Sequence, residues 1–82
     1  MAVTLLKVGD HLSLEMAPED LPRVRALIRS RWPDVRSRIA GIADVLTFGG
    51  ADFTYQNEWD DPCFISGTDV GDSLLRQIHA SP

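Results

Sequence analysis

Alternating apolar and polar residues at the start of the chain predict a β-hairpin over residues 2–16. Gly9-Asp10 is a suitable two-residue turn between two β-prone runs. Pairing about this turn gathers five apolar side chains on one face: Val3, Leu5, Leu12, Leu14 and Met16. The opposite face is mixed, which is typical of a sheet that helices cover on one side.

The spacing of apolar residues then predicts a helix from about Pro18 to Arg31. Proline is tolerated in a first turn, and the acids Glu19 and Asp20 suit the positive end of a helix dipole. The apolar residues fall within an arc of about 140°: Leu21, Val24, Leu27, Ile28 and Trp32. Pro33 should end the helix, because the residue before proline disfavours helical angles.

Residues 34–42 fit two structures. Val35 and Ile39 suit a short helical turn, whereas Arg36-Ser37-Arg38-Ile39 alternates like an edge strand. We favour the short helix or turn at this point.

The second half predicts another hairpin, with strands Ala43–Phe48 and Ala51–Gln56 around Gly49-Gly50. In this register Leu46 faces Phe53 and Phe48 faces Ala51. A polar loop over 57–62, a short strand over 63–65 and a closing helix should follow.

The closing helix should begin at a cap provided by Thr68 or Asp69. Its predicted apolar stripe is Val70, Leu74, Leu75 and Ile78. Asp72 and Arg76 are spaced for an i,i+4 ion pair. Together these elements predict a single α+β domain over residues 1–82. It should hold an antiparallel sheet of four to five strands, made of two hairpins plus a short strand. Two helices should pack on one face, in the order ββα-ββ-β-α.

The charges of this 82-residue chain are segregated, although its net charge is only −4. Six arginines lie between Arg23 and Arg38, whereas the stretch from Ile39 to Leu75 holds seven acids and neither lysine nor arginine. The negative net charge argues against a nucleic acid or an anionic membrane as the partner.

Cys63 is the single cysteine, which excludes an internal disulfide framework and favours a reducing compartment. No secretion signal begins the sequence, and no apolar run approaches the roughly 20 residues of a membrane span. We therefore expect a soluble cytoplasmic protein without a membrane partner.

Candidate chemistry is sparse. His11, His79, Cys63 and the acids of residues 58–72 lack the spacing of a metal site, so we predict no metal and no cofactor. Cys63 could pair with a histidine as a nucleophile, but its apolar strand favours a small buried hydrophobe. Gly49-Gly50 lacks the lysine and the following helix of a phosphate loop. We predict that the chain is not an enzyme.

Two surfaces could bind a partner. The first is acidic and aromatic: Tyr55, Glu58, Trp59, Asp60 and Asp61. Tryptophan and tyrosine are favoured anchors of protein interfaces, and carboxylates steer a basic partner. The second lies in the arginine-rich segment 23–38, where phosphate contacts would fall to Arg25, Arg29, Arg36 and Arg38. Trp32 would stack on a base in that alternative.

The segment from Phe48 to Ser66, which contains Phe-Gly-Gly-Ala-Asp-Phe and Glu-Trp-Asp-Asp-Pro-Cys-Phe, resembles the tail of small uncharacterised bacterial proteins. It also resembles immunity proteins of polymorphic toxin systems, which are short and acidic and bind a toxin domain. That resemblance implies a bacterial protein that acts on another protein by occlusion, and it carries no residue roles. The prediction is a small acidic protein-binding module, of which an immunity-type inhibitor is one instance. The alternative is a nucleic-acid-associated regulator using segment 23–38. A homodimer is also compatible, because an open edge strand can pair with a second copy.

Overall fold

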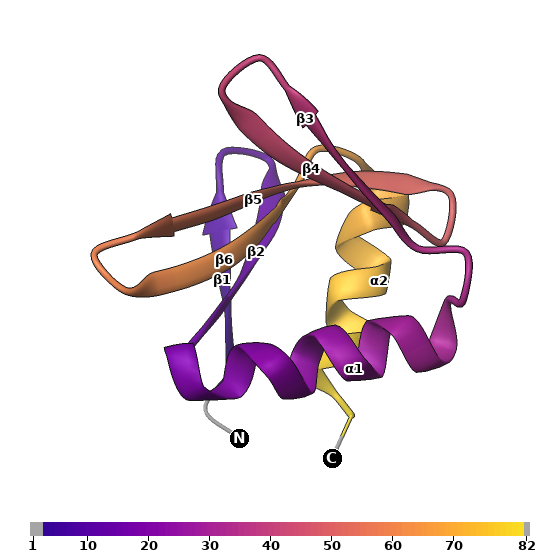
Figure 1. The fold of residues 1–82 in the computed structure, drawn as a ribbon, viewed down its shortest axis with the longest axis horizontal. Coiled ribbons are helices and arrows are strands. Elements are labelled where there is room, and N and C mark those ends of the chain that lie inside the picture. Colours follow the sequence, from indigo (N-terminus) through magenta and orange to yellow (C-terminus); the bar gives the residue numbers. More distant parts are fainter. Residues whose placement is uncertain (1–2, 82) are drawn as a thin grey trace.

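The computed structural model describes residues 3–81, without the side chain of Glu58, and contains a six-stranded antiparallel sheet with two helices (Figure 1). The elements in chain order are β1 (Val3–Val8), β2 (His11–Met16), the 3-10 turn η1 (Pro18–Asp20), α1 (Leu21–Arg31), β3 (Arg36–Ala40), β4 (Ala43–Phe48), β5 (Ala51–Glu58), β6 (Asp61–Ser66) and α2 (Asp69–His79). The predicted α+β class, antiparallel sheet and two helices are confirmed. The predicted four to five strands were too few.

Strands follow one another in the sheet as β1-β2-β6-β5-β4-β3. Tight turns join β1 to β2 and connect β3 through β6 as a meander, while α1 carries the chain from β2 to the far edge at β3. Strand β6 then returns to pair with β2, with Leu14 opposite Phe64. The first hairpin is thereby joined to the meander in one sheet.

The core lies between one face of the sheet and the two helices. Leu14, Phe53 and Phe64 from the strands are fully buried against Val24 of α1 and Leu75 of α2. Each such side chain contributes roughly 1.5–3 kcal/mol to folding through burial of its apolar surface.

Aromatic rings continue this core toward β4. Phe48 stacks on Phe53 at 4.4 Å between ring centroids, and Trp32 tilts against Phe48 at 4.9 Å. The hairpin register predicted around Gly49-Gly50 is confirmed, with Leu46 opposite Phe53 and Phe48 opposite Ala51. The apolar face predicted for the first hairpin is confirmed as well, because Leu14 and Met16 are buried and Leu5 packs against the core.

The short helix or turn favoured for residues 34–42 was wrong. The backbone N–H of Val35 donates to the carbonyl of Trp32, which closes a turn directly after α1. Arg36–Ala40 then pairs with Ala43–Thr47 as strand β3. Gly41, with φ of 65°, makes the tight turn that returns the chain into β4. Pairing with β4 outweighs the weak helical spacing of Val35 and Ile39.

The polar loop predicted over 57–62 was also wrong. Strands β5 and β6 continue until Glu58 pairs with Asp61, and only Trp59 and Asp60 form the turn. Both turn residues have φ of 56°.

Helix α2 begins as predicted, because the Thr68 hydroxyl accepts a hydrogen bond from the backbone N–H of Gly71 at 2.9 Å. Leu74, Leu75 and Ile78 are buried, but Val70 is 55% exposed and lies outside the apolar stripe. Asp72 faces His11 of the first hairpin in place of the predicted partner Arg76. Neither helix in residues 3–81 has the length and apolar character needed to cross a membrane.

Candidate protein-binding surface

The β5–β6 hairpin ends in a turn that is unusual for its residues. A two-residue turn with positive φ at both positions favours Asn-Gly, because Cβ is strained against the backbone in the left-handed region, which glycine avoids and asparagine tolerates. Trp59 and Asp60 occupy these positions, each with φ of 56°. The Trp59 side chain is 97% exposed, so the indole gains almost nothing from packing in the folded chain.

Acidic residues flank Trp59 in the sequence. Asp60 and Asp61 are exposed, and the side chain of Glu58 lies outside the described part of the structure. Glu15 of β2 adds a carboxyl that sequence reasoning missed. Its pKa is raised by burial and by a hydrogen bond with the Asp61 side chain. Glu15, Asp60 and Asp61 line a shallow depression of about 270 Å³ beside the turn. We call Trp59, Asp60 and Asp61 the acidic tip.

Tyr55 belongs to a different surface. It lies in β5, four residues before Trp59 of the turn, a separation of roughly 13 Å along a β-strand. Its ring tilts against Phe64 at 5.4 Å, and the Arg25 guanidinium carbon lies 5.0 Å from its centroid. The structure therefore separates Tyr55 from the acidic tip and places it beside α1.

The four arginines proposed for phosphate contacts gather around a hollow between α1 and the β3–β4 hairpin. This α1–β3 hollow has a volume of about 520 Å³ and is lined by Arg25, Ser37, Arg38, Ile39, Asp44, Val45, Leu46, Tyr55 and Phe64. A smaller adjoining depression is lined in part by Arg25, Arg29 and Arg36.

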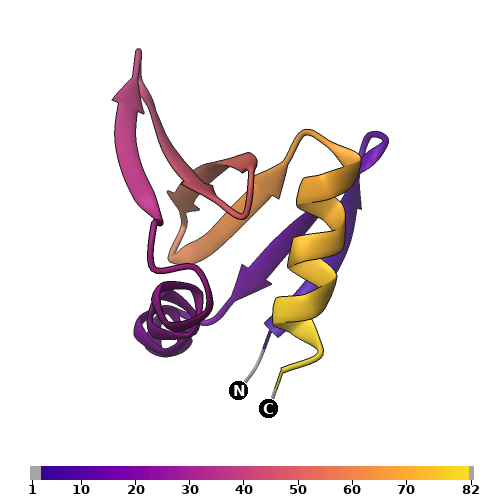
Figure 2. The same cartoon turned by 90° about the vertical axis from the view of Figure 1, so that its right-hand side faces the viewer.

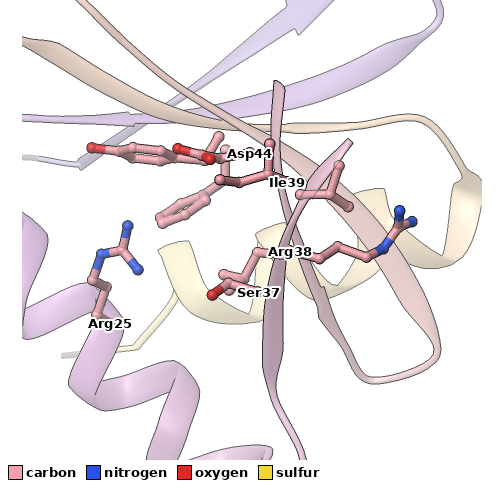
Figure 3. Close-up of a pocket in the computed structure, with 9 residues that line it drawn as sticks. Arg25, Ser37, Arg38, Ile39 and Asp44 are labelled. Carbon is pink, nitrogen blue, oxygen red and sulfur yellow. The ribbon is translucent and has the colours of Figure 1, made fainter. Parts of the chain in front are cut away.

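The arginines point in different directions, as Figure 3 shows. Arg25 of α1 points into the hollow, whereas Arg38 points to the other side of β3 and lies 3.4 Å from a carboxylate oxygen of Asp52. Asp44 lines the same hollow as Arg25. Trp32, the candidate for base stacking, packs against Phe48 and the core. Acidic residues thus lie among the four arginines, and Trp32 is not positioned beside them to stack on a base.

A third group joins the first hairpin to α2. Asp72 accepts hydrogen bonds from the backbone N–H of Leu12 and from the His11 ring, both at 2.9 Å. The hydrogen bond to Asp72 raises the pKa of His11. Burial by itself would raise the pKa of Asp72, but hydrogen bonds from His11, Leu12 and Ser66 lower it on balance. These hydrogen bonds connect the β1–β2 hairpin to α2.

Asp69 joins this group as a further ligand candidate. The ligand atoms of His11, Asp69 and Asp72 lie within 4.8 Å of one another, although His11 is far from the two aspartates in sequence. A metal here would have to replace the bond between His11 and Asp72. The arrangement is therefore accounted for by the link that it makes in the fold.

Cys63 is buried on the sheet, as the sequence predicted. Burial raises the pKa of its thiol, an effect that a hydrogen bond with Ser13 partly offsets. His11 is bonded to Asp72 on α2 and does not face this thiol.

No protein family, curated protein or solved structure matches this chain.

Proposed function

We propose that this chain is a protein-binding module whose acidic tip contacts the partner. The observation that carries the proposal is Trp59: a fully exposed indole on a backbone with φ of 56°. Left-handed backbone costs an ordinary residue about 1–2 kcal/mol. Asn or Gly at this turn would avoid that cost, so folding alone does not account for tryptophan.

A partner surface does account for it. Tryptophan is enriched among the residues that dominate binding energy, because one rigid ring buries a large apolar area. At the end of a hairpin the indole can enter a pocket without any change in the sheet. The strained turn supports this interpretation, since strain that folding does not require collects at functional positions.

The charge of the tip favours a basic partner. Asp60 and Asp61 stand beside the indole, and Glu15 lies close behind them. Carboxylates at the rim of an interface mainly speed encounter with a partner of opposite charge. Inhibition of a basic enzyme or toxin domain by occlusion is the instance of this function that we favour.

The nucleic-acid alternative has weaker support. A phosphate backbone requires cations along one continuous track. Arg25 and Arg38 point to opposite sides of β3, and Asp44 and Asp52 lie among the arginines.

The test begins with capture of partners from a lysate of the source cells, followed by purification of any stoichiometric protein. The dissociation constant of that protein is then measured for the wild type and for Trp59→Asn. We expect Trp59→Asn to weaken binding by about 30-fold, or 2 kcal/mol, through faster dissociation. Ile42→Asn is the matched control, because Ile42 is an equally exposed apolar residue in the β3–β4 turn.

The carboxylates provide a second readout. Replacing both Asp60 and Asp61 by asparagine should slow association and reduce its dependence on salt, with little change in dissociation. If the tryptophan and aspartate variants all bind the purified partner like the wild type, the acidic tip is not the contact surface.

A further inference from the structure

The edge of the sheet at β3 is open and lies beside the α1–β3 hollow. All five residues of β3 are exposed, and within residues 3–81 only β4 pairs with this strand. Figure 2 shows the β3–β4 hairpin directed away from α1 and on the opposite side of the molecule from α2. Neither helix covers this edge.

The register of the hairpin determines which backbone groups face outward. The two-residue turn makes Ala40 and Ala43 the closing pair, so Arg36, Arg38 and Ala40 share the ladder hydrogen bonds with β4. The N–H and C=O groups of Ser37 and Ile39 therefore point to the open edge. The same two residues line the hollow through their side chains.

We propose that β3 and the α1–β3 hollow form a second docking site, for an extended acidic segment of a partner protein that adds to the sheet as a seventh strand. In this mode of recognition main-chain hydrogen bonds supply affinity, and alternate side chains enter pockets that supply specificity. One set of the added side chains would fall toward Arg25, Ser37 and Ile39. The other set would lie beside Arg36 and Arg38.

The charges select the occupant. Arg36 and Arg38 occur within five residues of edge strand, and Arg25 points into the hollow. An antiparallel second copy that pairs along the whole of β3 would place Arg38 opposite its own counterpart, which is unfavourable. A strand bearing glutamate or aspartate at alternate positions would meet Arg36 instead, and would compete with Asp52 for Arg38. Ile39, which is 77% exposed, offers an apolar contact between these charges.

This site does not rest on the acidic tip, which has the opposite charge and lies at the end of another hairpin. The probe is an acetylated, amidated decapeptide of alternating glutamate and valine. Its matched counterpart carries lysine in place of glutamate. Amide hydrogen exchange and NMR shifts of the labelled protein report which backbone groups each peptide covers.

We expect the glutamate peptide to slow exchange at the Ser37 and Ile39 amides, and the lysine peptide to bind at least tenfold more weakly. Arg36→Glu should weaken binding of the glutamate peptide by about tenfold and improve that of the lysine peptide. Ile39→Pro should abolish binding of both, because proline removes an outward N–H without removing a bond to β4. Trp59→Asn should leave both affinities unchanged.

Three results would overturn the proposal. One is the absence of protection at Ser37 and Ile39 with millimolar glutamate peptide. Another is preferential binding of a ten-nucleotide oligothymidylate to the same amides, which would assign the arginines to nucleic acid. The third is concentration-dependent dimerisation that protects β3 without any peptide, which would make a second copy the occupant.

Discussion

The two edges of the sheet differ in what lies over them. At one edge, α2 packs on β1 and β2, and Asp72 fastens the hairpin through His11 and Leu12. At the other edge, β3 is exposed along its whole length and, among the described residues, pairs with β4 alone. Helix-covered strands hold the fold together, whereas β3 and the acidic tip leave their residues exposed.

The largest expected contrast lies between Phe64 in the covered region and Ile39 on the open edge. Phe64→Ala should cost about 3–5 kcal/mol of unfolding free energy, because Phe64 is fully buried and leaves a cavity. Ile39→Ala should change it by less than about 0.5 kcal/mol. Urea unfolding followed by circular dichroism measures both.

If Phe64→Ala does not fold, Phe64→Leu replaces it in the comparison. We expect Phe64→Leu to lose about 1–1.5 kcal/mol of unfolding free energy. A loss at Ile39 as large as that at Phe64 would mean that β3 belongs to the stable core.

The next effect concerns Gly71, in the first turn of α2. Alanine is ordinarily the better helix former by about 1 kcal/mol. A Cβ at Gly71 would overlap Ser66 Oγ and press on Thr68 and Phe53, so Gly71→Ala should instead destabilise by about 1–3 kcal/mol.

Gly67→Ala is the control, because a Cβ there meets nothing within 4 Å. Thermal unfolding of the two variants measures the difference. Equal stability would show that α2 can shift away from β6 at little cost.

A smaller effect should follow pH through His11 and Asp72. The pKa of His11 is raised in the fold. The contribution of His11 to folding stability is therefore complete below its pKa in the unfolded chain, about 6.5, and is lost as pH rises through its pKa in the folded chain. The pKa of Asp72 is lowered in the fold. The contribution of Asp72 to folding stability is therefore complete above its pKa in the unfolded chain, about 3.9, and is lost as pH falls through its pKa in the folded chain. The bond between His11 and Asp72 should therefore stabilise the folded chain most between about pH 4 and pH 6.5.

Melting temperatures across pH, for the wild type and His11→Gln, measure this dependence. The glutamine variant should lose stability at pH 5 and match the wild type more closely at pH 9. If the melting temperature of His11→Gln changes between pH 5 and pH 9 as much as that of the wild type, the pH dependence belongs to other groups.

The smallest effect is local and needs no variant. Amides of Ser37 and Ile39 should exchange with solvent almost as fast as in an unfolded chain, because they point to the open edge. Leu14 and Phe64 sit in strands paired on both sides and should exchange only through global unfolding. Slow exchange at Ser37 and Ile39 in the dilute protein would show that β3 is already covered.

Local chemistry explains which parts of the fold could be predicted. Gly9-Asp10 and Gly49-Gly50 are strong turn signals, so both hairpins and their registers follow from the residues around them. Thr68 is a good helix cap, and the cap is present. The turn at Trp59-Asp60 was missed because tryptophan does not favour left-handed backbone, and so residues 57–62 were interpreted as a polar loop.

Long-range contacts explain the rest. The pairing of β2 with β6 and the bond between His11 and Asp72 join residues about fifty or more positions apart. No local pattern encodes such contacts, so neither the position of β6 nor the role of Glu15 beside the tip could be predicted. The acids at the tip were proposed as a surface from the sequence, whereas the opposite directions of Arg25 and Arg38 depend on how α1 packs relative to β3.

The measurement that tests the central claim most directly is the unfolding free energy of Trp59→Asn, obtained by urea titration without any partner. Asparagine tolerates left-handed backbone, so we expect this variant to be more stable than the wild type by about 0.5–1 kcal/mol. That result would mean that Trp59 serves something other than folding. A loss of stability of similar size would show that the indole supports the folded chain, and would contradict the assignment of the acidic tip to binding.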